Sequence, residues 1–160
     1  MYRDGRPGRL ASAMNRLSAV QFSAGVLSPR RAVTLEVRGR RTGRMVSLPV
    51  VVADHEGQRY LVSMLGNDAN WVRNVRAAGG QAILRRGRRE PVHLTEVEPD
   101  ARAPILRRYL AVAPGARPHL PVDRHAPVEE FERIAELYPV FRITTISATP
   151  GQNPSTSDLP

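Results

Sequence analysis

Residues 32–38 and 44–53 are two stretches rich in Val and Leu that flank a short segment containing Gly39 and Gly43. Apolar and polar residues alternate along the first stretch, which is the period of a half-buried strand. Glycine reaches positive φ without steric cost, so the intervening segment can reverse the chain tightly. The pattern predicts an antiparallel hairpin with a turn suited to an anion, since the turn carries Arg40, Arg41 and Arg44.

Further strand-like segments follow the hairpin at intervals along the chain. Residues 54–57 form a polar turn before the next of them, which predicts a three-stranded antiparallel meander. The later strands are expected at 58–64, 81–86, 89–97 and 140–147. The basic turn around Gly87 joins the second and third of these four.

Helical periodicity occurs before and between the predicted strands. One helix is expected over 9–26, one from an Asn67 or Asp68 cap to Ala78, one from Asp100 or Pro104 to about Val112, and one from Pro127 to Pro139. Residues 113–127 contain four prolines and predict an irregular connection of the kind that often lines a site. We therefore expect an α+β fold, a small β-barrel of about six mostly antiparallel strands with inserted and flanking helices.

The length and the distribution of small polar residues bound the domain organisation. A chain of 160 residues fits one domain with a substantial core. We expect residues 9–147 to form this single domain, with disorder in 1–8 and in the Pro-, Ser- and Thr-rich tail 148–160.

Composition excludes several kinds of chemistry. The chain has no Cys, which removes thiol catalysis, disulfides and thiolate metal sites. Its four His residues show no close helical pair, so we expect no metal site. The net charge of +9 favours anionic partners, but all 24 basic residues are Arg, which indicates a coding bias. Arginine position is therefore more informative than arginine number.

No segment of this sequence has the apolar length of a signal peptide or a membrane span, which predicts a cytoplasmic protein. The predicted helix 9–26 has an apolar stripe and carries Arg9 and Arg16. Its ordinary role is to cover a sheet, and the alternative is peripheral contact with a membrane surface.

Four motifs occur in order along the chain, Gly39-Arg40-Arg41-Thr42-Gly43, Pro49-Val50, Ser63-Met64-Leu65-Gly66 and Trp71-x-x-Asn74. Together they resemble the deazaflavin-dependent nitroreductase family, and this resemblance implies a split β-barrel that binds a cofactor within the single domain 9–147. The chain departs from the family pattern in two places. Arg41 stands where a lysine is common, and the proline usual shortly before the tryptophan is missing.

The resemblance implies binding of coenzyme F420, whose phosphate and oligoglutamate tail are polyanionic. The arginines of the first turn would hold that tail, and backbone groups beside Pro49 and Ser63 would bind the flat ring. The cofactor-binding residues that it implies are Arg40, Arg41, Arg44, Ser47, Pro49, Val50, Val51, Ser63, Met64, Leu65, Gly66, Trp71 and Asn74.

The implied reaction is hydride transfer from the reduced deazaflavin to a quinone, a nitro compound or a similar electron-poor molecule. Tyr138 and Ser63 are the candidate catalytic groups on the substrate side, and His119 is a further candidate for approaching the substrate. For Tyr138 and Trp71 the competing interpretation is a place in the core.

Two alternative functions remain open at this point. A split barrel can instead use FMN, although a single phosphate needs fewer cations than a polyglutamate tail. The high positive charge also suggests a nucleic-acid-binding domain, but the few aromatic residues fall mostly in apolar patterns, so no nucleic acid is expected. The expected partner is a small-molecule electron acceptor, and the protein is expected to be a monomer or a homodimer.

Overall fold

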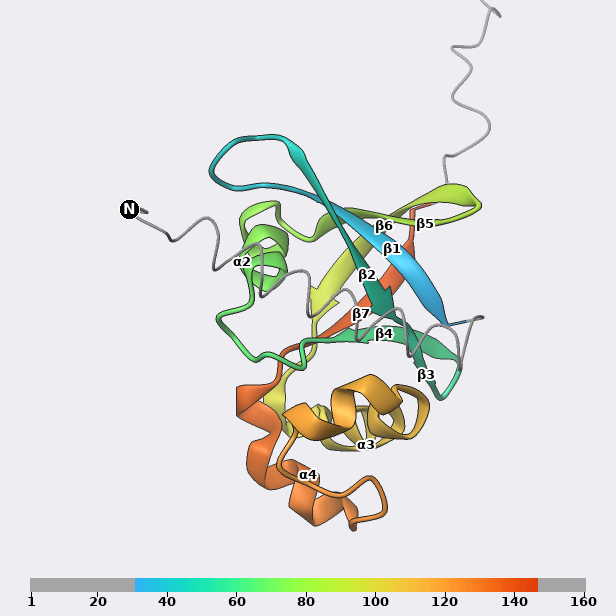
Figure 1. Ribbon diagram of the computed structural model, residues 1–160, viewed down its shortest axis with the longest axis vertical. Helices are drawn as coiled ribbons and strands as arrows, with labels where there is room; N and C mark the ends of the chain where they lie inside the picture. The colour runs from blue at the N-terminus through green and yellow to red at the C-terminus, as the bar shows by residue number, and fades with distance from the viewer. Residues whose placement is uncertain (1–30, 147–160) are drawn as a thin grey trace, which may run out of the picture.

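The computed structural model describes residues 31–146 (Figure 1). The predicted helix 9–26 and the predicted disorder of 1–8 and 148–160 lie outside these residues. The strands are β1 Ala32–Arg38, β2 Met45–Val51, β3 Ala53–His55, β4 Gln58–Val62, β5 Gln81–Arg86, β6 Arg88–Glu96 and β7 Val140–Thr145. The helices are α2 Asn70–Ala77, α3 Ala103–Val112 and α4 Val128–Ile134, with short 3₁₀ helices at Pro99–Ala101, Pro114–His119 and Ala135–Leu137.

All seven strands belong to one antiparallel sheet with the order β2-β1-β5-β6-β7-β4-β3. The first and last strands of this order are separated in sequence only by Val52, so the sheet curls until its two ends meet at that residue. The predicted α+β split barrel is therefore confirmed, and the predicted strand 44–53 bends at Val52 to contribute to both ends.

The predicted meander is present in a modified form. Residues 45–51 pair with β1, whereas residues 53–55 pair with β4. Each half of the predicted strand thus has one neighbour. β2 and β4 diverge from the bend at Val52, and within residues 31–146 no ladder joins them. This divergence opens the split in the barrel.

Side chains alternate between two apolar cores. Val50, Val52, Leu61 and Phe141 point into the barrel, where α2 contributes Trp71, Val72 and Val75. Val51, Ala53, Tyr60, Val62 and Val140 point outward and pack against α3 and α4. The period of two in the strands explains why consecutive residues such as Val50 and Val51 serve different cores. Figure 1 shows α3 and α4 together at one end of the sheet and α2 at the other side.

Two local predictions were wrong. Neither Asn67 nor Asp68 caps α2, because the cap position is Ala69 and has no side-chain cap bond. The Asp68 carboxylate pairs instead with Arg73, and the Asn67 amide donates to the Glu136 carbonyl. Residues 113–127 were expected to be irregular throughout, yet Pro114–His119 forms a 3₁₀ helix, for which Pro at the start supplies a suitable φ.

Candidate functional site

The basic turn between β1 and β2 is held by its own backbone. The Gly39 amide donates to the Arg44 carbonyl at 2.7 Å, and the Gly43 amide donates to the Gly39 carbonyl at 2.9 Å. Gly43 has φ +74°, as a tight reversal requires. Gly39 is needed for space instead, because a Cβ there would lie 3.2 Å from the Arg44 carbonyl oxygen.

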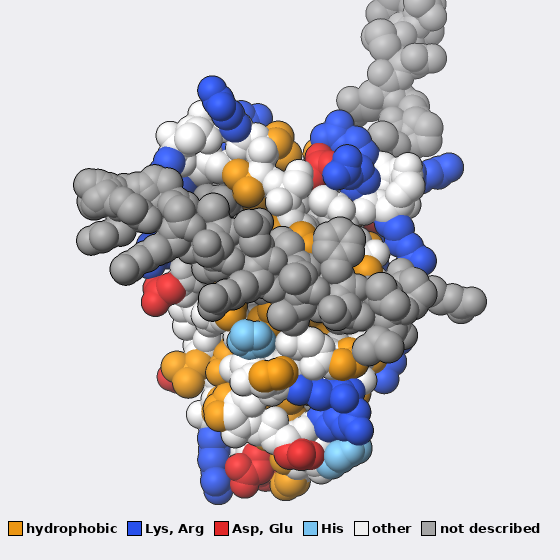
Figure 2. Space-filling model, in the orientation of Figure 1, with side chains coloured by type: hydrophobic (Ala, Val, Ile, Leu, Met, Phe, Trp, Pro, Cys, Tyr) orange, Lys and Arg blue, Asp and Glu red, His pale blue; other side chains and the backbone are white. Residues whose placement is uncertain are grey.

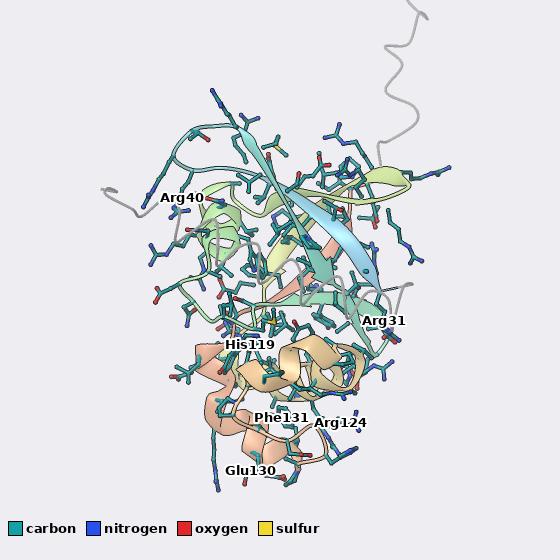
Figure 3. The ribbon with its side chains drawn as sticks, in the orientation of Figure 1. Arg31, Arg40, His119, Arg124, Glu130 and Phe131 are labelled. Atoms are coloured by element: carbon teal, nitrogen blue, oxygen red, sulfur yellow. The ribbon has the colours of Figure 1, made fainter. Side chains whose placement is uncertain are left out.

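Asn74 joins the basic turn to α2. Its side-chain oxygen accepts hydrogen bonds from the Arg40 amide at 3.1 Å and from Arg40 Nη1 at 2.8 Å. Asn74 is buried, with 5% of its surface exposed. Figure 3 shows Arg40 beside α2. Two of the motifs recognised in the sequence are therefore in direct contact, although they lie more than 30 residues apart.

Positive charge accumulates at this turn. Partial burial, followed by the charges of Arg41 and Arg73, lowers the pKa of Arg40 from its ordinary value. Within residues 31–146, the turn arginines Arg40, Arg41 and Arg44 form no ion pair with a carboxylate. An anion at this position would reduce the repulsion among these cations. Figure 2 shows basic side chains at the tip of the β1–β2 hairpin.

The arginines of the β5–β6 turn have a different environment. Thr34 of β1 pairs with Arg85, so this second turn lies at the end of β1 opposite to Arg40. The buried Glu36 carboxylate forms ion pairs with Arg85 at 3.2 Å and with Arg89 at 2.8 Å. Two arginines of this turn therefore satisfy a buried acid of the sheet.

The predicted ring-binding residues of β2 lie on its two faces. Ser47 is exposed opposite Glu36, and Pro49 is half-buried opposite Thr34. Val50 belongs to the barrel core and Val51 to the core beneath α3. In the described part of the chain, β2 pairs only with β1. Its other edge faces the split.

A pocket of ≈ 440 Å³ lies where β4 leads into α2. The pocket brings together three segments that contain predicted site residues. These are the segment after β4, the segment before β7 and the proline-rich connection. Its lining consists of Met64, Leu65, Gly66, Asn67, Asp68, His119, Leu137 and Tyr138.

The two main walls of this pocket touch through their backbones. The Ser63 amide donates to the Pro139 carbonyl at 3.0 Å, and the Ser63 hydroxyl donates to the Gly66 carbonyl at 2.7 Å. Gly66 has φ +88°, and a Cβ there would lie 3.2 Å from the Leu137 carbonyl oxygen. Ser63 itself is buried behind the pocket, where its hydroxyl closes a turn.

Tyr138 places its ring and its hydroxyl in different environments. The ring packs against the core formed with α3 and α4, and the hydroxyl donates to the His119 carbonyl at 3.2 Å. Figure 3 shows His119 next to α3. The hydroxyl therefore lies at the boundary between the pocket and the 3₁₀ helix Pro114–His119. Trp71, by contrast, is a core residue whose ring centroid lies 5.6 Å from that of Phe141.

Several residues of this region were not predicted from the sequence. Leu137 lines the pocket and is 57% exposed, and Arg73 adds its charge to the basic turn. Arg73 directly precedes Asn74 in the predicted helix, and this adjacency was the available signal for it. Glu96 and Arg102 lie behind the pocket in contact with each other at 3.1 Å, and no local pattern marks them.

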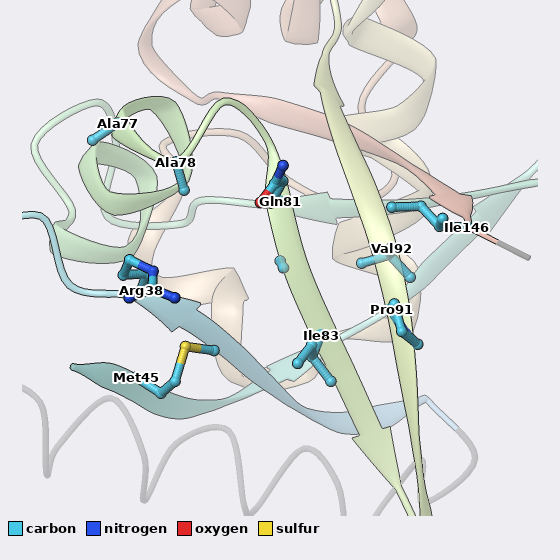
Figure 4. Close-up of a pocket in the computed structure, with 10 residues that line it drawn as sticks. Arg38, Met45, Ala77, Ala78, Gln81, Ile83, Pro91, Val92 and Ile146 are labelled. Carbon is cyan, nitrogen blue, oxygen red and sulfur yellow. The ribbon is translucent and has the colours of Figure 1, made fainter. Parts of the chain in front are cut away.

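A second pocket of ≈ 460 Å³ lies on the outer face of the sheet (Figure 4). Its lining includes Arg38, Met45, Gln81, Ile83, Pro91 and Ile146. None of the predicted site residues lines it, and it offers no carboxylate, hydroxyl or imidazole group. We therefore place the candidate site at the split and not here.

Over residues 31–146, no group of three or more His, Asp or Glu side chains is arranged to hold a metal ion. No helix in the same range has both the length and the apolar character to cross a membrane.

Three solved structures match this chain at low sequence identity. A protein of unknown function from Agrobacterium tumefaciens matches with TM-score 0.50 and 13% identity, over 72% of this chain and 48% of that one. A conserved hypothetical protein from Mycobacterium tuberculosis matches with TM-score 0.50 and 15% identity, over 72% of each chain. An F420-H2 dependent reductase matches with TM-score 0.46 and 22% identity, over 72% of this chain and 95% of that one.

The first two likenesses support the fold. The chain corresponds to about half the length of the Agrobacterium protein. No curated protein sequence matches the chain. Residues 9–130, however, match the model of one sequence family, and this range contains the basic turn, the β2 edge, the Ser63–Gly66 segment and Asn74. The chain belongs to the F420H2-dependent quinone reductase family.

Proposed function

We propose that this protein is an oxidoreductase that uses reduced F420 to reduce a quinone, a nitro compound or a similar electron-poor small molecule. The observation that carries the proposal is the turn with Arg40, Arg41 and Arg44, which form no ion pair with a carboxylate within residues 31–146. Asn74 holds the first of these arginines against α2. Membership of the F420H2-dependent quinone reductase family supports the use of reduced F420 but does not identify the electron acceptor.

The basic turn fits the polyanionic part of F420. Arg40 is fixed by Asn74, so Arg41 and Arg44 are the residues most available to a ligand, and both are exposed. Guanidinium groups bind phosphate and carboxylate through paired hydrogen bonds. Several anionic groups in a row match several cations better than the single phosphate of FMN does.

The split between β2 and β4 fits a flat ring. The edge of β2 that carries Ser47 to Val51 pairs with no strand of the described chain, so its backbone groups are available to a ligand. The segment Ser63 to Gly66 bounds the split from the other side, and α2 with Trp71 fills the barrel behind it. The residues present thus offer a cation-rich end and a hydrogen-bonding edge to one elongated ligand.

The pocket lined by Met64, Leu65, Gly66, Leu137 and Tyr138 is the proposed acceptor site. Bound F420 would supply a hydride as a two-electron donor. The chain would contribute mainly position, by holding the acceptor next to the ring and excluding water with Leu65 and Leu137. The Tyr138 hydroxyl is the proposed proton donor, and Ser63 is proposed to shape the turn beneath the acceptor.

Titration with F420 tests the proposal. Arg41→Ala with Arg44→Ala should weaken binding at least about 100-fold, because two charge-assisted contacts of roughly 1.5–3 kcal/mol each are lost. Arg88→Ala with Arg107→Ala removes the same charge from exposed positions away from the β1–β2 turn, and this variant should leave the affinity for F420 nearly unchanged. Equal weakening in both variants would mean that only net charge matters. Wild-type protein should also oxidise F420H2 when menadione is added, and absence of that turnover would contradict the catalytic part.

A further inference from the structure

We propose that Glu96 and Arg102 are positioning residues for the pocket at residues 64–68 and 137–138. Neither side chain lines that pocket. Both act through the backbone and side chains of its walls. The inference rests on the proposed function only in naming the pocket as the acceptor site.

Arg102 holds one wall from behind. Its Nη1 donates to the Ala135 carbonyl at 3.0 Å and to the Tyr138 carbonyl at 3.4 Å, and its Nε donates to the Val97 carbonyl at 2.8 Å. Only 4% of Arg102 is exposed. A buried guanidinium with three carbonyl partners therefore fixes both ends of the segment 135–138.

Glu96 connects this arginine to the other wall. Its carboxylate accepts from Arg102 Nη2 at 3.1 Å, from Arg76 Nη2 at 2.7 Å and from Arg76 Nε at 2.9 Å. Arg76 Nη2 also donates to the Asn67 side-chain oxygen at 3.2 Å. Asn67 is a lining residue of the pocket, so the carboxylate links α2, α3 and the segment after β4.

The contacts close into a ring. Asn67 Nδ2 donates to the Glu136 carbonyl at 3.1 Å, which returns the path to the wall that Arg102 holds. The ring passes from Glu96 through Arg102, the segment 135–138, Asn67 and Arg76 back to Glu96. Two side-chain connections, in addition to the backbone bond from Ser63 to Pro139, thus set the distance between the Asn67 wall and the Tyr138 wall. The Glu96 carboxylate joins both arginines of the ring.

Gln in place of Glu96 keeps the shape but removes the charge and one acceptor oxygen. Three donors of two arginines then face one carbonyl oxygen and an amide group that is itself a donor. The connection from Arg76 to Asn67 and the connection from Arg102 to the 135–138 segment should therefore loosen together. The basic turn is outside this ring of contacts, so the contacts proposed between Arg41, Arg44 and the F420 tail should be retained.

Glu90→Gln is the matched control. Glu90 lies on the same strand, and its carboxylate accepts from Arg59 Nη2 at 2.8 Å and from the Thr145 hydroxyl. It forms a comparable ion pair but touches no residue of the pocket. A general loss of stability from removing one carboxylate of β6 will therefore be seen in both variants.

Amide hydrogen exchange without cofactor or acceptor measures wall placement directly. In Glu96→Gln, exchange at Gly66 and Tyr138 should be at least tenfold faster than in Glu90→Gln, because their amides donate within the two walls. Equal exchange in the two variants would overturn the proposal. In steady-state assays, Glu96→Gln should raise the KM for menadione at least fivefold. If amide exchange shows that the walls have loosened but the KM is unchanged, the link between these residues and the acceptor site is overturned.

Arg102→Lys provides a second variant if Glu96→Gln folds poorly. Lys keeps the charge but cannot reach Val97, Ala135 and Tyr138 carbonyls together, so the same exchange and KM changes are expected. Wild-type protein that fails to oxidise F420H2 would contradict the proposed function, whereas the exchange comparison would still decide whether this ring positions the walls.

Discussion

The Asn74 side-chain oxygen lies 2.8 Å from Arg40 Nη1 and 3.1 Å from the Arg40 amide, and it accepts a hydrogen bond from each. One buried amide thereby fixes both the backbone and the side chain of the first arginine in the basic turn. The turn is attached to a helix of the barrel core and is not a free hairpin tip. Its remaining arginines are consequently presented in a defined direction.

Asn74→Ala should weaken F420 binding about tenfold and destabilise the fold by about 1–2 kcal/mol, because two hydrogen bonds are lost, one of them to a charged group. Fluorescence titration and urea unfolding measure the two effects. Asn70→Ala, on an exposed position of the same helix, is the control and should change neither. Wild-type affinity in Asn74→Ala would show that the turn does not need this anchor.

Tyr138→Phe should reduce kcat for a quinone about 100-fold while F420 affinity is retained, because the only atom removed is the hydroxyl oxygen at the pocket boundary. Stopped-flow oxidation of F420H2 measures the step. Tyr60→Phe is the control, since Tyr60 is buried in the same core but lies outside the pocket lining. A kcat equal to wild type would indicate that solvent provides the proton.

The sequence predicted most elements of the fold because strand alternation and helix periodicity are local signals. Strand 32–38 is an example that the structure confirms. The helix predicted from Pro127 to Pro139 begins after Pro127 as expected, but its α-helical part ends at Ile134 and a 3₁₀ helix follows to Leu137. The sequence did not predict that residues 44–53 bend at Val52, because the bend is decided by which neighbour each half can pair with. Closure of a barrel depends on the pairing of all its strands, so the ten residues 44–53 alone carry no signal for it.

The candidate site, like the fold, could be predicted only in part from the sequence. The motifs around Arg40, Asn74 and Gly66 were visible in the sequence, and the structure brings the first two into contact. Asn67 was predicted to cap a helix, because Asn is a favourable cap residue. In the structure its side chain instead forms hydrogen bonds with the Glu136 carbonyl and with Arg76. Glu96 and Arg102 had no signal, because their partners come from four separate segments of the chain.

Acid should destabilise the protein partly through Asp54. Hydrogen bonding from Arg31 is the main cause that lowers the pKa of Asp54 from 3.8 to about 2, and Arg108 at 3.1 Å adds to it. A depressed carboxyl pKa stabilises the folded state above the unfolded value, and this stabilisation is lost as pH falls from about 3.8 to about 2. The carboxylate is 55% exposed, so the contribution is modest.

Asp54→Asn should therefore be less stable than wild type at neutral pH and should lose less stability between pH 4 and pH 2. Urea unfolding at a series of pH values gives both quantities. Asp100→Asn, at an exposed position, should unfold with the pH profile of the wild type. Parallel profiles for wild type and Asp54→Asn would rule out a contribution from this carboxyl group.

Leu137 and Met45 are exposed to similar extents, 57% and 46%, and each lines a different pocket. If the acceptor binds between the 64–68 and 137–138 walls, Leu137 contributes apolar contact to it and Met45 does not. Leu137→Ser should raise the KM for menadione about fivefold, which corresponds to about 1 kcal/mol for partial burial of a leucine side chain. Met45→Ser should leave that KM unchanged. The opposite result would move the acceptor to the outer face of the sheet, where Met45 and Ile146 lie, and would separate the acceptor from the Tyr138 hydroxyl.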